Sequence, residues 1–218
     1  MKHRRFLLLI LFSFSATGFA ADVIVQDRSG WRSVNAEQET EIRQGVLQVQ
    51  PDTELLNLSV RDAGGLGAIT RRKCAEGVIN QKFIETALAG FLDGTSHYGY
   101  AVESREPATL GPLSGFHVIT SGNMSGTHFT AANWLLFAKR DFYVVTVYDF
   151  GDPRDLAAME AEYSSRIQFS PAVEPPLSAK DSTKGPGYEA GYVTGKFILP
   201  IVLLIASVVL TILLVRLR

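Results

Sequence analysis

The sequence contains a single cysteine, Cys74, among 218 residues. One cysteine excludes an intramolecular disulfide and any zinc site built from several thiolates. The chain also lacks an excess of either charge, because 21 Lys and Arg residues face 22 Asp and Glu residues. This balance offers no general attraction to nucleic acid. At roughly 100–200 residues per domain, the length excludes a second large catalytic domain.

Residues 1–20 are typical of a secretory signal peptide. Met1–Arg5 is basic, and the apolar run Phe6–Phe14 is followed by small residues. The small side chains favour cleavage after Ala20, and cleavage after Ala21 is the near alternative. An uncleaved signal anchor is the competing interpretation, although the apolar run is shorter than the roughly 20 residues of a membrane span.

The other end of the chain carries a long apolar run. Residues 197–215 contain no charged side chain and are followed by Arg216 and Arg218. At about 1.5 Å per residue this run is about 28 Å long, close to the thickness of a bilayer core. We expect a transmembrane helix over 196–216 and a cytoplasmic end at 217–218, because positive residues favour the cytoplasmic side. The predicted location is the inner (plasma) membrane, with the N-terminal domain outside the cytoplasm, in the periplasm of a Gram-negative cell. A sorting tail that is removed after export is the alternative.

A predicted linker rich in proline and glycine, 171–195, precedes the apolar run. Gly187, Gly191 and Gly195 recur in it every four residues. On a helix they would form a smooth stripe that lets a second helix approach closely, so they are a candidate helix–helix contact of a homo-oligomer. The alternative is that these glycines end a flexible linker.

The exported domain is expected to span residues 21–170. Between Asp22 and Pro171 there are 13 Lys and Arg residues and 19 Asp and Glu residues, which disfavours docking to nucleic acid or anionic lipid. Apolar residues at helical spacing predict a helix over 71–92, ended by Asp93-Gly94. Gly64–Gly67 is expected to break the chain. Short strands are expected at 23–26, 45–50, 55–60, 97–104 and 115–121.

The clearest pattern is a pair of apolar runs, 133–138 and 142–150, joined by a short polar turn. This pattern predicts a β-hairpin whose second strand, apolar on both faces, is covered on both sides. Asp152-Pro153 then favours the start of a helix. We therefore expect an α+β fold, a three-layer α/β/α sandwich with a mostly antiparallel sheet, plus one C-terminal transmembrane helix. One face of the second helix carries Leu156, Met159, Tyr163 and Ile167.

Three segments together resemble the PsbP-type fold family: Leu110–Ile119, the hairpin Asn133–Phe150, and a helix that ends in Ser164–Phe169. The resemblance covers about residues 100–170. This family includes the extrinsic photosystem II subunit, a Ran-binding nuclear import factor and many bacterial exported proteins. The resemblance implies a compact α/β/α module that binds or supports protein partners, and it supplies no common catalytic residues. The signal peptide and membrane span differ from the plant and nuclear members, so their partners are not transferred.

The sequence offers few candidates for chemistry. Cys74 follows three basic residues near the expected start of a helix, where cations and the helix dipole would lower its thiol pKa. Its base would be His97 or His117. These two histidines and His128 lack the close spacing of a zinc site, so hydrogen-bonded or solvated histidines are the default interpretation.

The sequence thus favours a non-enzymatic binding or accessory module for envelope proteins, without catalytic residues, cofactor or metal ion. Protein partners in the envelope and a homo-oligomer are expected, and nucleic acid is not. The alternative is a membrane-anchored envelope enzyme that uses Cys74 or an acidic cluster. That cluster comprises Asp149, Asp152 and Asp155.

Overall fold

The computed structural model describes residues 22–26, 30–34, 39–40, 42–44, 52–61, 64–74, 79–124, 126–150 and 155–176. The predicted signal peptide, the glycines at 187, 191 and 195, the predicted span 196–216 and the strand expected at 45–50 lie outside these residues. Within them, no helix has both the length and the apolar character needed to cross a membrane.

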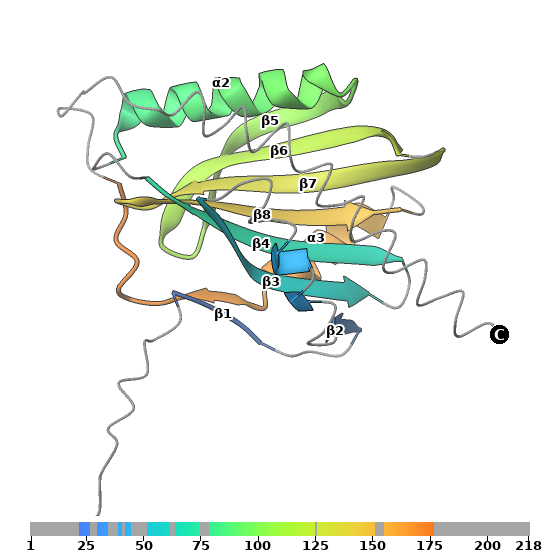
Figure 1. The fold of residues 1–218 in the computed structure, drawn as a ribbon, viewed down its shortest axis with the longest axis horizontal. Coiled ribbons are helices and arrows are strands. Elements are labelled where there is room, and N and C mark those ends of the chain that lie inside the picture. Colours follow the sequence, from blue (N-terminus) through green and yellow to red (C-terminus); the bar gives the residue numbers. More distant parts are fainter. Residues whose placement is uncertain are drawn as a thin grey trace, which may run out of the picture.

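The described residues form two sheets in which every strand pairing is antiparallel (Figure 1). The larger sheet has seven strands in the order β2-β3-β4-β8-β7-β6-β5, and the smaller one pairs β1 with β9. This arrangement confirms an α+β fold built on an antiparallel sheet. The strands are β1 (Val23–Val25), β2 (Trp31–Ser33), β3 (Thr53–Arg61), β4 (Gly65–Lys73), β5 (Ala101–Leu110), β6 (Leu113–Met124), β7 (Thr127–Phe137), β8 (Asp141–Asp149) and β9 (Ile167–Phe169).

Strands β5 to β8 follow one another as hairpins and occupy one half of the sheet. The predicted hairpin is confirmed and is longer than expected, because β7 and β8 pair from Thr130–Asp149 to Phe137–Phe142. Helix α2 (Gln81–His97) connects β4, beside β8, with β5 at the sheet edge. Helix α2 runs alongside the strands near β5, and from β5 the chain returns strand by strand to β8 beside β4 (Figure 1).

Helix α2 covers one face of the sheet. Its side chains Phe83, Ala87 and Phe91 are buried against strand residues such as Leu135 and Val144. The helix begins after Asn80, whose side-chain Oδ1 accepts a hydrogen bond from the backbone N–H of Phe83 at 2.9 Å. This cap satisfies a backbone donor that has no partner within the helix.

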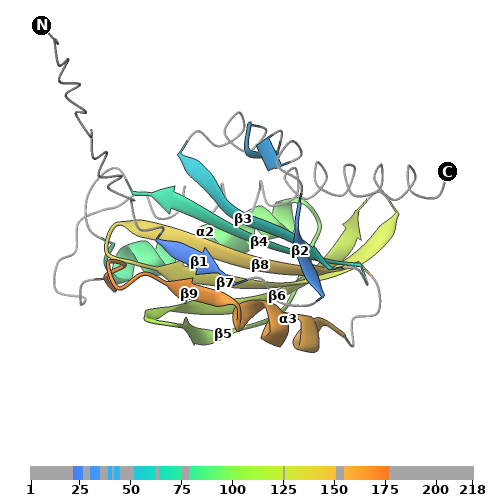
Figure 2. The ribbon, with the colours of Figure 1, turned by 90° about the horizontal axis from the view of Figure 1, so that it is seen from below.

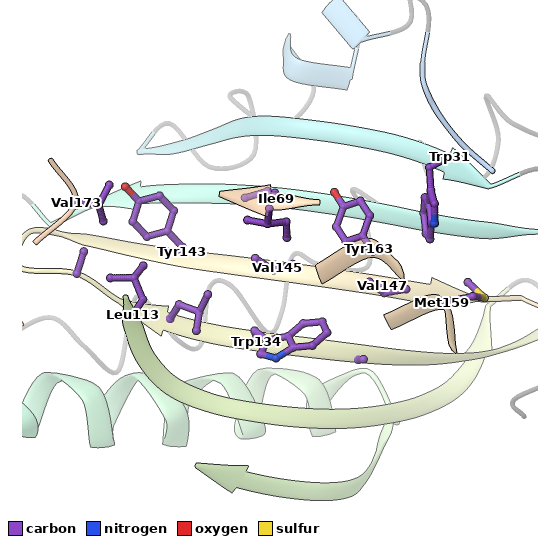
Figure 3. Close-up of a cluster of buried hydrophobic side chains, with 14 of the residues drawn as sticks. Trp31, Ile69, Leu113, Trp134, Tyr143, Val145, Val147, Met159, Tyr163 and Val173 are labelled. Atoms are coloured by element: carbon purple, nitrogen blue, oxygen red, sulfur yellow. The ribbon is translucent and has the colours of Figure 1, made fainter. Parts of the chain in front are cut away.

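Helix α3 (Leu156–Ser164) packs on the opposite face, as Figures 2 and 3 show. Met159 and Tyr163 are buried there with Trp134 and Val145. Neighbouring residues of β8 point to opposite faces, so Val144 lies in the α2 cluster and Val145 in the α3 cluster. The expected covering of β8 on both sides is thus confirmed.

Two expectations for the middle of the chain are wrong. Gly64 lies in the turn between β3 and β4, with a φ of +96°, but Gly65–Gly67 do not break the chain, because β4 starts at Gly65 and pairs with both β3 and β8. The segment 71–73 belongs to β4, and the helix runs from Gln81 to His97, so Asp93-Gly94 lies inside it. Gly94 is buried against the sheet and does not act as a stop. The strand expected at 97–104 starts later and ends later, as Ala101–Leu110, and the strand expected at 115–121 is longer at both ends, as Leu113–Met124.

The first and last strands of the domain lie side by side. Val23 pairs with Phe169, and the backbone N–H of Ser170 donates to the carbonyl of Asp22 at 2.9 Å. The Nε of the buried Arg166 donates to the carbonyl of Gln26 at 2.7 Å. The Arg166 guanidinium also lies over the Trp31 and Tyr163 rings, 5.8 and 5.6 Å from their centroids. After β9 the chain stays on the domain, since Val173 is buried in the α3 cluster and Glu174 pairs with Lys139 at 2.6 Å.

Candidate functional site

His117 occupies the junction between the sheet and α3. It lies on β6, where the strand register places it between Glu106 of β5 and Trp134 of β7. Alternation along β6 turns its side chain toward the face that carries α3. Its ring centroid lies 4.9 Å from that of Trp134, which belongs to the buried cluster beneath the helix (Figure 3).

Both nitrogens of the His117 ring face carboxylates. Nε2 lies 2.8 Å from Oε1 of Glu160, which projects from α3. Nδ1 lies 3.5 Å from Oε1 of Glu106, on the neighbouring strand. The histidine side chain is 12% exposed, Glu160 20% and Glu106 70%. The site thus joins β5, β6 and α3, with a tight pair on the inner side and a looser, solvated pair on the outer side.

These carboxylates raise the pKa of His117 above its ordinary value of 6.5. The largest cause is the hydrogen bond to Glu160, and burial of the ring opposes it. The charges of Glu160 and Glu106, together with the hydrogen bond to Glu106, raise the pKa further. The arrangement therefore favours the imidazolium form, in which both nitrogens donate.

The chemistry available at this cluster is proton binding. Within the ranges that the structure describes, no group of three or more His, Cys, Asp and Glu side chains has an arrangement that could hold a metal ion. Of the other histidines, His97 ends α2 and His128 is exposed on β7. Sequence patterns gave no sign of the His117 cluster, since Glu160 lies 43 residues further along the chain.

Beside this cluster runs the exposed edge strand β5. Every residue from Ala101 to Pro107 is exposed, and the remaining three are exposed or half-buried. Glu103 accepts a hydrogen bond from the Ser121 hydroxyl, and the strand register shifts between Val102 and Ser104. We refer to Ala101–Leu110 as the β5 edge.

The structure differs from the setting expected for a reactive cysteine. Cys74 follows β4 instead of starting a helix, and its backbone N–H donates to the carbonyl of Arg140 at 2.9 Å. Burial raises the pKa of Cys74 from 9.0 to about 11, although Arg72 acts in the opposite direction and Asp141 adds to the rise. A thiol with this pKa is a poor nucleophile at neutral pH.

The predicted acidic cluster is described only in part. Asp149 is buried at the end of β8, whereas Asp155 is exposed just before α3. Asp152 lies outside the described residues, as does the helix–helix contact predicted for Gly187, Gly191 and Gly195.

No protein-family profile matches this sequence, and a search of curated proteins finds no relative. Among solved structures, the chain is similar to LpqN of Mycobacterium tuberculosis, described as involved in cell envelope biogenesis. The identity is 11%, the TM-score 0.47, and the match covers 68% of this chain and 83% of LpqN. A protein from Bacteroides thetaiotaomicron is similar over 68% of this chain, with 12% identity and a TM-score of 0.41. This chain spans 45% of that protein's length. The resemblance to the PsbP type stays a prediction.

Proposed function

We propose that this chain is a single-pass membrane protein whose exported domain binds a protein partner in the cell envelope, without catalysing a reaction. The signal peptide, linker and C-terminal apolar run in the sequence support this topology. The domain contributes the binding surface, which we assign to the β5 edge.

The observation that carries this proposal is the exposure of β5. This ten-residue strand ends the seven-stranded sheet, whereas β2, at the opposite edge, has three residues. An edge strand leaves a row of backbone N–H and C=O groups without a neighbouring strand. An extended segment of another protein can add to such an edge, with main-chain hydrogen bonds providing affinity.

The β5 edge also carries features that oppose indiscriminate pairing. Pro107 has no N–H to donate, and the register shift next to Glu103 interrupts the regular hydrogen-bonding pattern. The charged side chains of Glu103, Arg105 and Glu106 are exposed. Like charges placed opposite one another destabilise a strand pair. The partner that fits is a protein with an extended segment that carries basic side chains near Glu103 and Glu106.

Site-specific cross-linking in living cells tests this proposal. A photoreactive amino acid replaces Val102 or Ser104 of the full-length chain, and Ala89, exposed on α2, is the matched control position. We expect adducts with one envelope protein from the β5 positions and not from Ala89. We also expect Glu103→Arg, combined with the probe at Ser104, to reduce their yield. Equal capture from Ala89, or no adduct from β5, would contradict the proposal.

A further inference from the structure

Two carboxylates face the His117 ring as hydrogen-bond acceptors, but the neutral ring has only one N–H to donate. A neutral imidazole carries a proton on one nitrogen and presents a lone pair at the other. With carboxylates facing both nitrogens, the neutral ring can donate to Glu160 or to Glu106 but turns a lone pair toward the remaining anion. The imidazolium carries an N–H on each nitrogen and presents its positive charge to both carboxylates. The contacts of all three residues therefore depend on one proton.

The inner carboxylate fixes one flank of α3. Glu160 connects the helix to β6 through His117, while Glu162, two residues later, accepts a hydrogen bond from Trp31 Nε1 at 3.2 Å. Glu162 also pairs with Arg61 of β3 at 3.1 Å. The helix is thus held on both sides by carboxylates, one toward β2 and β3 and one toward β6.

We propose that His117 is a proton-operated latch, which joins α3 and the β5 edge to β6 when it is charged and releases Glu106 when it is neutral. Glu106 is the group released because its contact is longer, at 3.5 Å against 2.8 Å, and because water reaches 70% of its side chain. Glu160 keeps the remaining N–H of the neutral ring, so the attraction of the ring to α3 weakens and Glu106 is released, while the backbone pairing of β5 with β6 stays in place. The latch acts within the domain and requires no partner.

The charged groups that face the ring determine the pH range of the latch. They are Glu106 from β5 and Glu160 from α3, and β7 contributes the uncharged ring of Trp134. A histidine whose pKa is higher in the folded chain than its unfolded value of 6.5 stabilises the fold fully below about pH 6.5. This contribution disappears as the pH rises through the folded pKa. It also weakens below about pH 5, where the glutamates take up protons.

Titration of the four histidines by NMR tests the latch directly. The purified full-length chain, labelled with ¹³C at histidine Cε1, is titrated from pH 5 to pH 9, and the His117 signal is assigned with His117→Gln. We expect a midpoint above 6.5 for His117 in the unmodified chain. Glu160→Gln should lower its proton affinity at least threefold, and Glu106→Gln should lower it by a smaller factor.

Glu103→Gln is the matched control, because Glu103 lies on the same strand but contacts Ser121. It should leave the midpoint of His117 unchanged. A midpoint at or below 6.5, or a midpoint unaffected by Glu160→Gln, overturns the proposal. Urea unfolding gives a second measurement: the midpoint concentration should fall between pH 6 and pH 9, and this fall should be smaller in His117→Gln. An equal fall in both proteins also overturns the latch.

Discussion

Two glycines of β4 lie where side chains of α3 contact the backbone of the sheet. A Cβ atom at Gly65 would overlap the terminal methyl of Met159, and one at Gly67 would overlap the Tyr163 ring. Tyr163 has little freedom to move, since its hydroxyl donates to Asn57 Oδ1 at 2.8 Å and its ring contacts Trp31. The distance between α3 and the sheet therefore depends on the absence of a side chain at these positions.

Gly67→Ala should lower the free energy of unfolding by about 2 kcal/mol, because inserting a methyl into a packed interface forces a shift of the ring or helix. Chemical denaturation of the full-length chain measures this. Tyr163→Leu provides the internal control, since the smaller side chain relieves the overlap. In a double-mutant cycle, Gly67→Ala should cost less in the Tyr163→Leu background than in the unmodified chain. Additive effects would argue against the contact.

The raised pKa of Cys74 predicts slow thiol chemistry. A rise from 9.0 to about 11 lowers the thiolate fraction at neutral pH about 100-fold. Iodoacetamide should therefore alkylate Cys74 far more slowly at pH 7 than it alkylates an exposed thiol, and the rate should keep rising up to about pH 11. Ser96→Cys in a Cys74→Ala background supplies the exposed reference, on the last turn of α2. A faster reaction at Cys74 than at this reference would contradict the prediction.

At the scale of the element, the start of α2 depends on one side chain. Removing the hydrogen bond from the Phe83 N–H to the Asn80 side chain leaves that buried donor unsatisfied. Asn80→Ala should reduce the free energy of unfolding by about 1 kcal/mol. Asn80→Asp keeps an acceptor oxygen and should therefore lose much less stability. Thermal unfolding of the two variants measures the difference. Equal losses would show that the cap contributes nothing.

Local patterns predicted some elements better than others. The β7–β8 hairpin was predictable because two apolar runs and a polar turn lie next to one another in the chain. β4 was missed because Gly65 and Gly67 are typical of turns. In the fold these glycines leave room for Met159 and Tyr163 of α3, a helix that begins about 90 residues later. The helix predicted over 71–92 started too early because the basic residues 71–73, which pair with β8, were assigned to it.

The candidate site could not be predicted from local sequence patterns either, because its residues come together only in the fold. His117 has no other histidine close to it in the sequence, and its partners come from an adjacent strand and from a helix that follows two further strands along the chain. Neither the spacing of residues in the sequence nor its composition predicts that Glu106 and Glu160 lie next to His117. Cys74 shows the converse, since its basic neighbours in the sequence suggested reactivity, whereas burial in the fold has the larger effect on its pKa.

At the scale of the whole molecule, the stripe of Gly187, Gly191 and Gly195 makes a prediction about assembly. Replacing all three with leucine should reduce the oligomer size of the full-length chain in detergent, because bulky side chains prevent close approach of two helices. Sedimentation equilibrium measures the size. Val193→Leu, which lies between two of these glycines, should have no effect. An unchanged size in the triple variant would remove self-association through this stripe.

The pairing of β1 with β9 has a mechanical consequence. Residues 22 and 170 lie at the same end of the β1–β9 pair. A force that pulls them apart therefore breaks the hydrogen bonds between the two strands one after another. The Ser170–Asp22 hydrogen bond would break first, then the Val23–Phe169 pair, and the contacts of Arg166 with Gln26 last. A force applied beyond residue 176 would first have to detach Val173 and Glu174, which attach the chain to the α3 cluster and to Lys139. The domain should therefore yield to weak tension at its ends while its sheet stays intact.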